Sequence, residues 1–203
     1  MSNLRLVVFD VDGTLIDSQD VIFAAMRRTF SRLGAPEPSK AQTLSIIGLS
    51  LENAVATLMP ELSDADVKAG AQLYRESFIE IRAETGGEAS APLYPGARAA
   101  LDRLHSQDET LLGVATGKAR RGLDHAYESH GIGHYFVTHQ TADGHPSKPH
   151  PSMLHQTLRD TGVDVSRAVM IGDTDFDMEM GKAAGFATVA VEWGYHSLDR
   201  LKK

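Results

Sequence analysis

The sequence predicts an α/β fold: a Rossmann-like core built on a parallel sheet, interrupted by an inserted all-helical cap. Three observations support this prediction. Residues 4–9 form an almost unbroken apolar run, as expected of a strand covered on both faces. Residues 15 to about 91 read as helical throughout, with no convincing strand. After residue 110, strand patterns alternate with helical ones, which indicates parallel strands joined by crossover helices.

The composition narrows the possible function classes. The chain has 203 residues, 42% of them hydrophobic, and 20 basic and 27 acidic residues give a net charge of −7. There is no basic run, so we expect no nucleic-acid partner. No apolar run has bilayer length, so we expect no membrane partner. Without cysteine, disulfide and thiolate chemistry are excluded, and without a signal-peptide pattern we expect a cytoplasmic protein. The sequence carries no signal for the oligomeric state.

The helical region, residues 15–94, is the predicted cap domain, and residues 1–14 and 95–203 form the predicted core domain. Because the cap leaves the core directly after an acidic turn, we expect it to lie over that turn as a lid. The helices expected in the cap cover residues 18–33, 51–58 and 64 to Gly86–Gly87, which closes the last one.

The core continues with four further strands, the second of them weak. In order, the expected elements are a short helix from 97, a strand at 110–115, a helix at 119–129, a weak strand around 135–138, a helix at 151–162, a strand at 168–171, a helix to 184 and a strand at 186–191.

Polar residues follow four of these strand regions, and in a parallel sheet all four positions fall along one edge. Chance would scatter polar residues over both edges, and open α/β sheets bind ligands at the carboxyl ends of their strands. We therefore predict a functional site at that edge. The four positions are Asp10 with Asp12, Thr116-Gly117-Lys118, Lys148, and Asp173 with Asp177.

Phosphoryl transfer is the chemistry that suits these residue types. Asp10, Asp12 and Asp173 offer the hard oxygen ligands that Mg²⁺ prefers. A bound metal and Lys148 would neutralise the oxygens of a phosphoryl group, so that an anionic carboxylate can approach it. An aspartate can then act as nucleophile and form an aspartyl-phosphate.

A phosphoryl group also needs hydrogen-bond donors. The hydroxyl of Thr116 is one, and the backbone amides of Gly117 and Lys118 at the start of a helix are others. Catalysis would then consist mainly of positioning and charge stabilisation.

Each candidate also has a plainer interpretation. Asp10 and Asp12 suit an acidic turn, and Thr116 suits a helix N-cap. Lys148 on its own suits a solvated loop. Asp177 suits the positive end of a helix, and Asp175 is expected to be only a helix cap. The joint placement of the candidates along one sheet edge favours the functional interpretation.

Four ordered motifs resemble those of the haloacid dehalogenase superfamily of phosphohydrolases, and the helical insertion resembles its first cap type. The resemblance covers nearly the whole chain. Three further stretches, Tyr94-Pro-Gly96, Ala-Thr-Gly-Lys118 and Gly-Asp-Thr174, look most like the phosphoglycolate phosphatase branch. The four motifs are Asp10-Val-Asp12-Gly-Thr14, Thr116-Gly117, Lys148-Pro149 and Gly172-Asp173-Thr-Asp-Phe-Asp177.

The resemblance implies an order of events at the carboxylates. Asp10 would attack phosphorus and bind Mg²⁺ through its other oxygen. Asp12 would protonate the leaving oxygen and then activate water, while its backbone carbonyl binds the metal. Asp173 would bind Mg²⁺ directly, and Asp177 would stand behind it or reach it through water.

The resemblance also implies how the substrate is held. Thr116 would hold the phosphoryl group, with the amides of Gly117 and Lys118 beside it, and Lys148 would bridge Asp10 and the phosphate. The small cap and the modest polarity of residues 48–51 suggest a small phosphorylated metabolite such as 2-phosphoglycolate as the substrate. Arg75, Arg82 and Lys118 are candidates for meeting its carboxylate.

Two other functions remain open at this point. A phosphosugar mutase of the same fold would use the same core, but residues 45–51 lack a basic residue to grip a sugar phosphate. A signalling module that holds phosphate on aspartate would have no use for a cap or for Asp12. The histidine-rich segment 125–155 has irregular spacing, so surface and loop histidines are favoured over a metal cluster.

Overall fold

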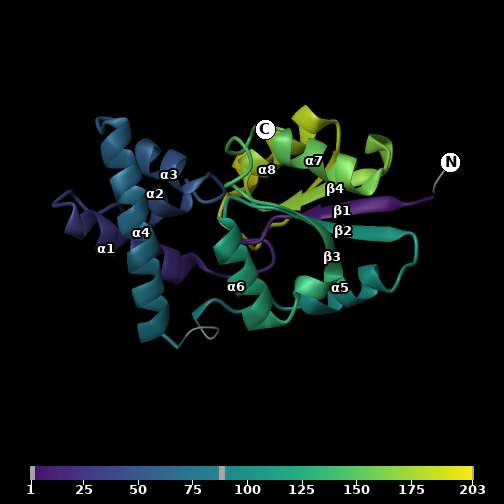
Figure 1. Cartoon of the computed structure of the whole chain (residues 1–203), viewed down its shortest axis with the longest axis horizontal. Coiled ribbons are helices and arrows are strands. Elements are labelled where there is room, and N and C mark those ends of the chain that lie inside the picture. Colours follow the sequence, from purple (N-terminus) through teal and green to yellow (C-terminus); the bar gives the residue numbers. More distant parts are fainter. Residues whose placement is uncertain (1–2, 87–89, 203) are drawn as a thin grey trace.

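A computed structural model of the chain describes residues 3–86 and 90–202. One parallel sheet forms the core, with strand order β3-β2-β1-β4-β5 (Figure 1). The predicted α/β class is therefore confirmed. The strands are β1 (Arg5–Phe9), β2 (Thr110–Ala115), β3 (Phe136–Gln140), β4 (Ala168–Gly172) and β5 (Ala187–Ala190).

Helices cover both faces of this sheet, and Figure 1 shows α5 and α6 on one side with α7 and α8 on the other. The helices that accompany the core are α5 (Ala97–His105), α6 (Arg120–His130), α7 (Ser152–Thr161), α8 (Asp175–Ala184) and α9 (Leu198–Leu201), with 3₁₀ turns η2 (Gly133–Tyr135) and η3 (Val165–Arg167).

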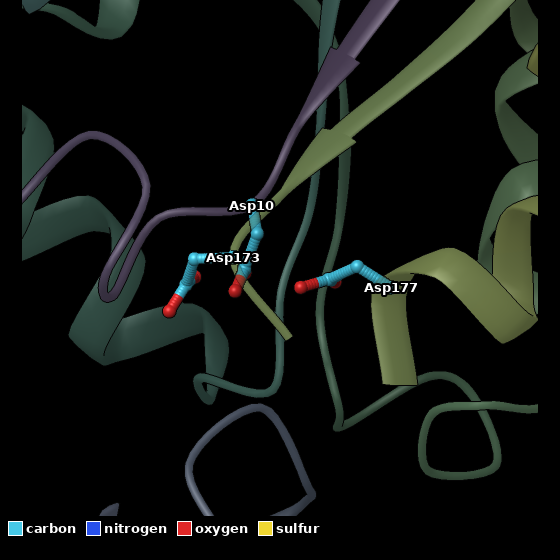
Figure 2. A group of neighbouring side chains, drawn as sticks. All are labelled: Asp10, Asp173 and Asp177. Carbon is cyan, nitrogen blue, oxygen red and sulfur yellow. The ribbon is translucent and has the colours of Figure 1, made fainter. Parts of the chain in front are cut away.

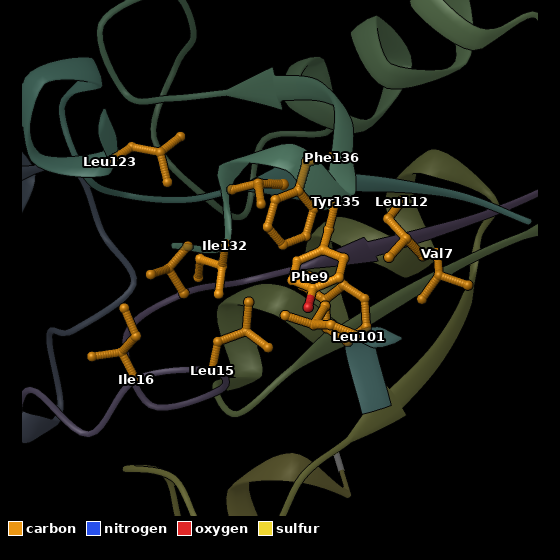
Figure 3. Close-up of a cluster of buried hydrophobic side chains, with 12 residues drawn as sticks. Val7, Phe9, Leu15, Ile16, Leu101, Leu112, Leu123, Ile132, Tyr135 and Phe136 are labelled. Atoms are coloured by element: carbon orange, nitrogen blue, oxygen red, sulfur yellow. The ribbon is translucent and has the colours of Figure 1, made fainter. Parts of the chain in front are cut away.

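Strand β1 is central and contributes to both sides of the core, because successive side chains of a strand point to opposite faces. Leu6 and Val8 pack with residues of α7 and α8, whereas Val7 and Phe9 pack with residues of α5 and α6. Figure 3 shows the second of these clusters around Phe9. Burial on both faces explains why the strand is an apolar run without alternation.

The inserted region folds as α1 (Gln19–Arg32), α2 (Lys40–Leu44), α3 (Leu51–Leu58) and α4 (Asp64–Glu84), beyond the carboxyl ends of the strands (Figure 1). Apolar side chains of α1, among them Met26 and Phe30, pack into one cluster with Ile81 of α4. On the outer side, Arg28 pairs with Glu84 at 2.7 Å. The insertion thus has a small core of its own.

Two linkers join the insertion to the core, and they run side by side. The amide of Tyr94 donates to the carbonyl of Leu15 at 2.9 Å, and the amide of Asp17 donates to Pro92 at 2.8 Å. Ile16 also forms an antiparallel bridge with Leu93. These contacts hold the two linkers together, and Leu15 and Ile16 pack into the core cluster around Phe9.

A few details differ from the sequence-based expectations. Helices α2 and α9 were not anticipated, since each is only one turn long. Helix α4 ends at Glu84 with Thr85 as its C-cap, while the Gly87 of the expected stop lies outside the described residues. Within residues 3–86 and 90–202, no helix combines the length and apolar character needed to cross a membrane.

Candidate active site

The predicted site residues converge at the carboxyl edge of the sheet. Asp10 directly follows β1, and its amide donates to Ile171 of β4 at 2.9 Å. Thr116 directly follows β2, and its amide donates to Gln140 of β3 at 3.0 Å. Because β1 lies between β2 and β4, these extensions of the ladder bring the polar residues of three strands together.

Asp10, Asp173 and Asp177 form the acidic centre of this edge. One carboxylate oxygen from each lies within 4.8 Å of the others, and all three residues are buried. Figure 2 shows their side chains converging from the end of β1, the end of β4 and the start of α8. Three buried carboxylates at this separation repel one another unless cations or protons neutralise them.

Lys148 supplies one positive charge to this acidic centre. Its Nζ lies 2.9 Å from Oδ1 of Asp10 and 2.7 Å from Oδ1 of Asp177, and its side chain is 0% exposed. Burial alone would lower its pKa, but the negative charges of Asp10 and Asp177 outweigh burial and raise it. Lys148 is therefore a buried ammonium ion and not a solvated loop lysine.

The charges of the acidic centre are still not balanced, since one lysine faces three carboxylates. Burial raises the pKa of Asp10 to about 7, against the lowering effect of Lys148. Burial and the neighbouring carboxylates also raise the pKa of Asp173 well above its usual value. Within the described residues, Oδ2 of Asp10 has no hydrogen-bond partner. A buried, unpartnered carboxylate oxygen and a charge deficit are what a divalent cation would satisfy, so the residues fit Mg²⁺.

Asp173 is fixed from two sides. The hydroxyl of Thr14 donates to its Oδ1 at 2.9 Å, and the amide of Tyr195 donates to its Oδ2 at 2.8 Å. Gly13 has a positive φ of 86°, and a Cβ there would lie 2.1 Å from Oδ2 of Asp173. The glycine that follows Asp12 is thus required both by the turn and by the approach of this carboxylate.

Asp177 connects the acidic centre to Lys148 and to the start of α8. Its Oδ1 bonds Lys148, while its Oδ2 accepts hydrogen bonds from the amide and hydroxyl of Thr174, at 3.1 and 2.7 Å. Thr174 is therefore the N-cap of α8, in a reciprocal capping box with Asp177. The expectation that Asp175 is the cap is wrong: it is the first helical residue, and it pairs with Arg200 at 2.7 Å.

Asp12 has different surroundings, although it is two residues from Asp10. Its Oδ2 lies 2.8 Å from Nζ of Lys118, and its Oδ1 accepts a short hydrogen bond from the hydroxyl of Ser18. Nζ of Lys118 also lies 5.7 Å from the ring centre of Phe78 on α4. The Asp12 side chain thus points away from the acidic centre, so that any contribution of this residue to a metal would come from its backbone.

Thr116, Gly117 and Lys118 form a loop against which the cap packs. Thr116 is buried but is not a helix cap, since α6 begins with Ala119 as its N-cap. A Cβ on Gly117 would lie 2.5 Å from the carbonyl oxygen of Leu49 in the cap. The absence of a side chain at residue 117 is therefore what lets the cap approach the loop closely.

The sequence did not indicate that residues 193–195, called the Tyr195 brace below, contact the turn after β1 and Asp173. The hydroxyl of Tyr195 accepts from the amide of Ser18 at 2.9 Å and lies 3.2 Å from its side-chain oxygen. The indole of Trp193 donates to the carbonyl of Thr14 at 3.1 Å. A Cβ on Gly194 would overlap the Asp173 side chain. The aromatic-glycine-aromatic order was the available signal, because only a glycine between two large side chains permits this approach.

The histidines of segment 125–155 do not form a metal centre. Among the described residues, the acidic centre is the one group of three or more His, Asp or Glu side chains placed to share an ion. His139 bonds the hydroxyl of Tyr127 at 2.9 Å, and His145 lies 2.9 Å from Gln140. These histidines serve local contacts, and His130 on α6 is buried, so the expectation of surface and loop histidines does not hold for every member of the segment.

The site is thus a group of buried carboxylates and a buried lysine at the carboxyl edge of a capped parallel sheet, an arrangement of the α/β class. The chain belongs to the haloacid dehalogenase-like hydrolases, because the model of that family matches residues 7–191. It is similar to "Probable phosphatase IndB" of Dickeya dadantii, at 34% identity over 97% of this chain and 85% of the relative.

Two further comparisons agree with this assignment. A phosphoglycolate phosphatase of Vibrio cholerae is 31% identical over 97% of this chain and 88% of its own length. A haloacid dehalogenase-like hydrolase from Streptococcus pneumoniae superposes with a TM-score of 0.82 at 28% identity, covering 100% of this chain and 91% of that one. The family resemblance read from the four motifs is confirmed.

Proposed function

We propose that this phosphoric monoester hydrolase cleaves a small phosphate monoester through an aspartyl-phosphate on Asp10, with Mg²⁺ at the acidic centre. One observation carries the proposal: the Asp10, Asp173 and Asp177 oxygens lie within 4.8 Å of one another, with Nζ of Lys148 bonded to two of the three side chains. Bound Mg²⁺ would supply the positive charge that lets an anionic nucleophile meet an anionic phosphate.

In the first step, a carboxylate oxygen of Asp10 attacks phosphorus and the bond to the leaving oxygen breaks. Attack requires the ionised form of Asp10, and burial disfavours that form in the metal-free protein. Lys148, in contact with Oδ1, favours the ionised form and would also face a transferred phosphoryl oxygen. We assign metal binding to Asp10, Asp173 and the backbone carbonyl of Asp12, with Asp177 acting through Lys148 or a water molecule.

Asp12 moves the protons in this proposal. Protonated Asp12 gives its proton to the leaving oxygen, and the resulting carboxylate then takes a proton from the water that attacks the phosphoenzyme. That attack breaks the bond between phosphorus and Asp10 and releases inorganic phosphate. The contacts with Lys118 and Ser18 suit the carboxylate form, which is the form that activates water.

The loop after β2 holds the phosphoryl group. The buried hydroxyl of Thr116 and the amides of Gly117 and Lys118 are the proposed donors. The cap reaches this loop through Gly48 and Leu49, whose carbonyl oxygens would lie 2.6 and 2.5 Å from a Cβ on Gly117. Together with the cap, the loop would exclude water from the phosphoryl group in the first step.

We propose 2-phosphoglycolate as the substrate, on the strength of the similarity to the Vibrio cholerae relative named for that activity. The direct test is phosphate release from 2-phosphoglycolate with Mg²⁺, with EDTA, and with Mg²⁺ restored after EDTA. We expect release that depends reversibly on the metal. Undiminished release in EDTA would contradict the metal-assisted mechanism.

Two other outcomes would contradict the proposal in a different way. Conversion of glucose 1-phosphate to an isomer, with a bisphosphate activator and little phosphate release, would indicate a mutase. A phosphoenzyme that lasts many minutes with negligible turnover would indicate a signalling module.

A further inference from the structure

A cavity opens beside Asp12, between helix α4 of the cap and helix α6 of the core, with the two linkers closing one end. Its lining includes Asp12, Ile16, Phe78, Arg82, Lys118 and His125. The other carboxylates of the site do not line it. Since Asp12 is the proposed proton donor to the leaving oxygen, the leaving group must lie on this side of the phosphoryl group.

The two positively charged side chains that line the cavity, Lys118 and Arg82, differ in whether they have an ion-pair partner. Lys118 is already compensated, because its Nζ lies 2.8 Å from Asp12 and packs against the ring of Phe78. Arg82, one helical turn after Phe78, has no ion pair or hydrogen bond to any residue in the described part of the chain. His125 lies on the opposite wall, with its Nε2 3.4 Å from the hydroxyl of Ser129. Among residues 3–86 and 90–202, the lining therefore carries one positive charge, that of Arg82, without a partner.

Arg82 differs in this respect from the arginines of the α1–α4 interface. Arg28 pairs with Glu80 and Glu84, and Arg32 pairs with Glu80, all on the side of α4 that faces α1. Arg82 lies between these two glutamates in sequence but projects into the cavity on a different face of the helix. Its partial burial lowers its pKa, which is the cost of holding a guanidinium there without a partner.

We propose that Arg82 binds a negative charge carried by the leaving group of the substrate, so that the enzyme selects phosphate esters and anhydrides with an anionic leaving group. This inference rests on the proposed phosphatase function and assigns its specificity to one residue. A guanidinium forms bidentate hydrogen bonds with a carboxylate or a phosphate, and both chemistries suit the cavity. A carboxylate would come from a 2-phosphoglycolate-like ester, and a phosphate would come from pyrophosphate.

The test compares kcat/KM for 2-phosphoglycolate, pyrophosphate and ethyl phosphate in wild-type enzyme, Arg82→Gln and Arg82→Lys. We expect wild type to prefer one of the two anionic compounds over ethyl phosphate. Arg82→Gln should reduce that preference about 10- to 100-fold, chiefly through KM, because a charge-assisted bond is lost. Arg82→Lys should restore part of it. The anionic compound whose preference falls identifies the source of the charge.

Arg103→Gln is the matched control. Arg103 lies on α5 and is exposed, and it is not part of the cavity lining, so the same charge change there should leave the preference unaltered. An Arg82→Gln preference equal to that of wild type, or an equal loss in Arg103→Gln, would overturn the proposal.

Binding measurements can test the role of Arg82 independently of the proposed phosphatase activity. In an Asp10→Asn background, which cannot turn over by the proposed route, calorimetry would compare 2-phosphoglycolate and ethyl phosphate with and without Arg82→Gln. Tighter binding of the anionic compound that disappears with Arg82→Gln supports the role of Arg82 even if wild type proves inactive as a phosphatase. Equal binding of both compounds overturns the role of Arg82 even if wild type is an active phosphatase.

Discussion

Two lysine–carboxylate groups lie side by side in this site and differ in almost every physical property. Lys148 is 0% exposed and pairs with two buried aspartates, whereas the Lys118 side chain is 15% exposed and pairs with one carboxylate, that of Asp12, at the cavity. Only Val11 separates Asp10 from Asp12, yet their carboxylates point into different surroundings. The buried group of Lys148, Asp10 and Asp177 is suited to binding charged ligands, and the cavity-facing pair of Lys118 and Asp12 is suited to proton transfer.

The largest expected effect is the loss of phosphatase activity when Asp10 of the buried group is replaced. Asp10→Asn should reduce phosphatase activity by about 10⁴-fold or more, because it removes the nucleophile. The same change should leave metal-free thermal stability at pH 8 equal to or above that of wild type, since it removes a buried charge that lacks a full complement of partners. Phosphate-release assays and thermal denaturation measure the two effects.

Asp199→Asn serves as the control, because Asp199 is exposed on α9 and distant from the acidic centre in sequence. It should be active and equally stable. An Asp10→Asn enzyme that retains a few per cent of the wild-type rate would contradict the nucleophile assignment.

Replacing the lysines should separate the two groups in stability. Lys148→Met leaves Asp10 and Asp177 buried without their shared cation, and we expect a loss of about 3–5 kcal/mol in the free energy of unfolding. Lys118→Met should cost about 1 kcal/mol or less, because its pair with Asp12 is partly solvated. Urea denaturation at pH 7.5 without metal measures both. Equal losses would mean that burial does not distinguish the two pairs.

The acidic centre also predicts how stability depends on pH. Asp10 has a pKa of about 7 in the metal-free folded protein, and that of Asp173 is raised in the same direction. Between about pH 4 and pH 7 the folded state therefore binds more protons than the unfolded state, so the free energy of unfolding should fall as pH rises. We expect a decrease of roughly 2–4 kcal/mol across this window.

Mg²⁺ should remove much of this decrease, because it replaces the protons as the neutralising charge. Denaturation at a series of pH values, with and without Mg²⁺, tests the expectation. The opposite result would be a metal-free protein whose free energy of unfolding rises from pH 4 to pH 7, without any effect of Mg²⁺. That result would show that the negative charges of the acidic centre are already neutralised.

The smallest expected effect concerns the Tyr195 brace on the Asp12 side. Tyr195→Phe removes the hydroxyl that bonds Ser18, whose own hydroxyl bonds Asp12. We expect kcat to fall about 3- to 10-fold with little change in KM, since the substrate is still bound while Asp12 is less well oriented. Tyr127→Phe, which removes a hydroxyl bonded to His139, should leave kcat unchanged. A change in KM alone would contradict a positioning role.

The secondary-structure elements and their parallel arrangement could be predicted from the sequence, because they depend on local hydrophobic patterns and on the alternation of strands and helices. The five strands, their parallel arrangement and the helical insertion follow from apolar runs and alternation. The placement of Asp10, Thr116 and Asp173 at one edge follows from the rule that parallel strands share their carboxyl ends.

What could not be predicted depends on contacts between segments far apart in the chain. The bond between Tyr195 and Ser18 spans 177 residues, and nothing local to either residue indicates it. The deep burial of Lys148 depends on α8 bringing Asp177 to it. The N-cap of α8 could not be predicted for a more local reason. Thr174 and Asp175 are both residue types that cap helices well, and only the capping box between Thr174 and Asp177 decides in favour of Thr174.

The role of Asp10 is tested most sharply by a crystal structure with Mg²⁺ and beryllofluoride, a mimic of the phosphoryl group on aspartate. We expect beryllium bonded to a carboxylate oxygen of Asp10, with Mg²⁺ bound by Asp10 and Asp173 and with Lys148 facing the fluorides. Beryllium on another residue, or Mg²⁺ bound away from Asp10 and Asp173, would show that Asp10 is not the nucleophile of a metal-assisted reaction.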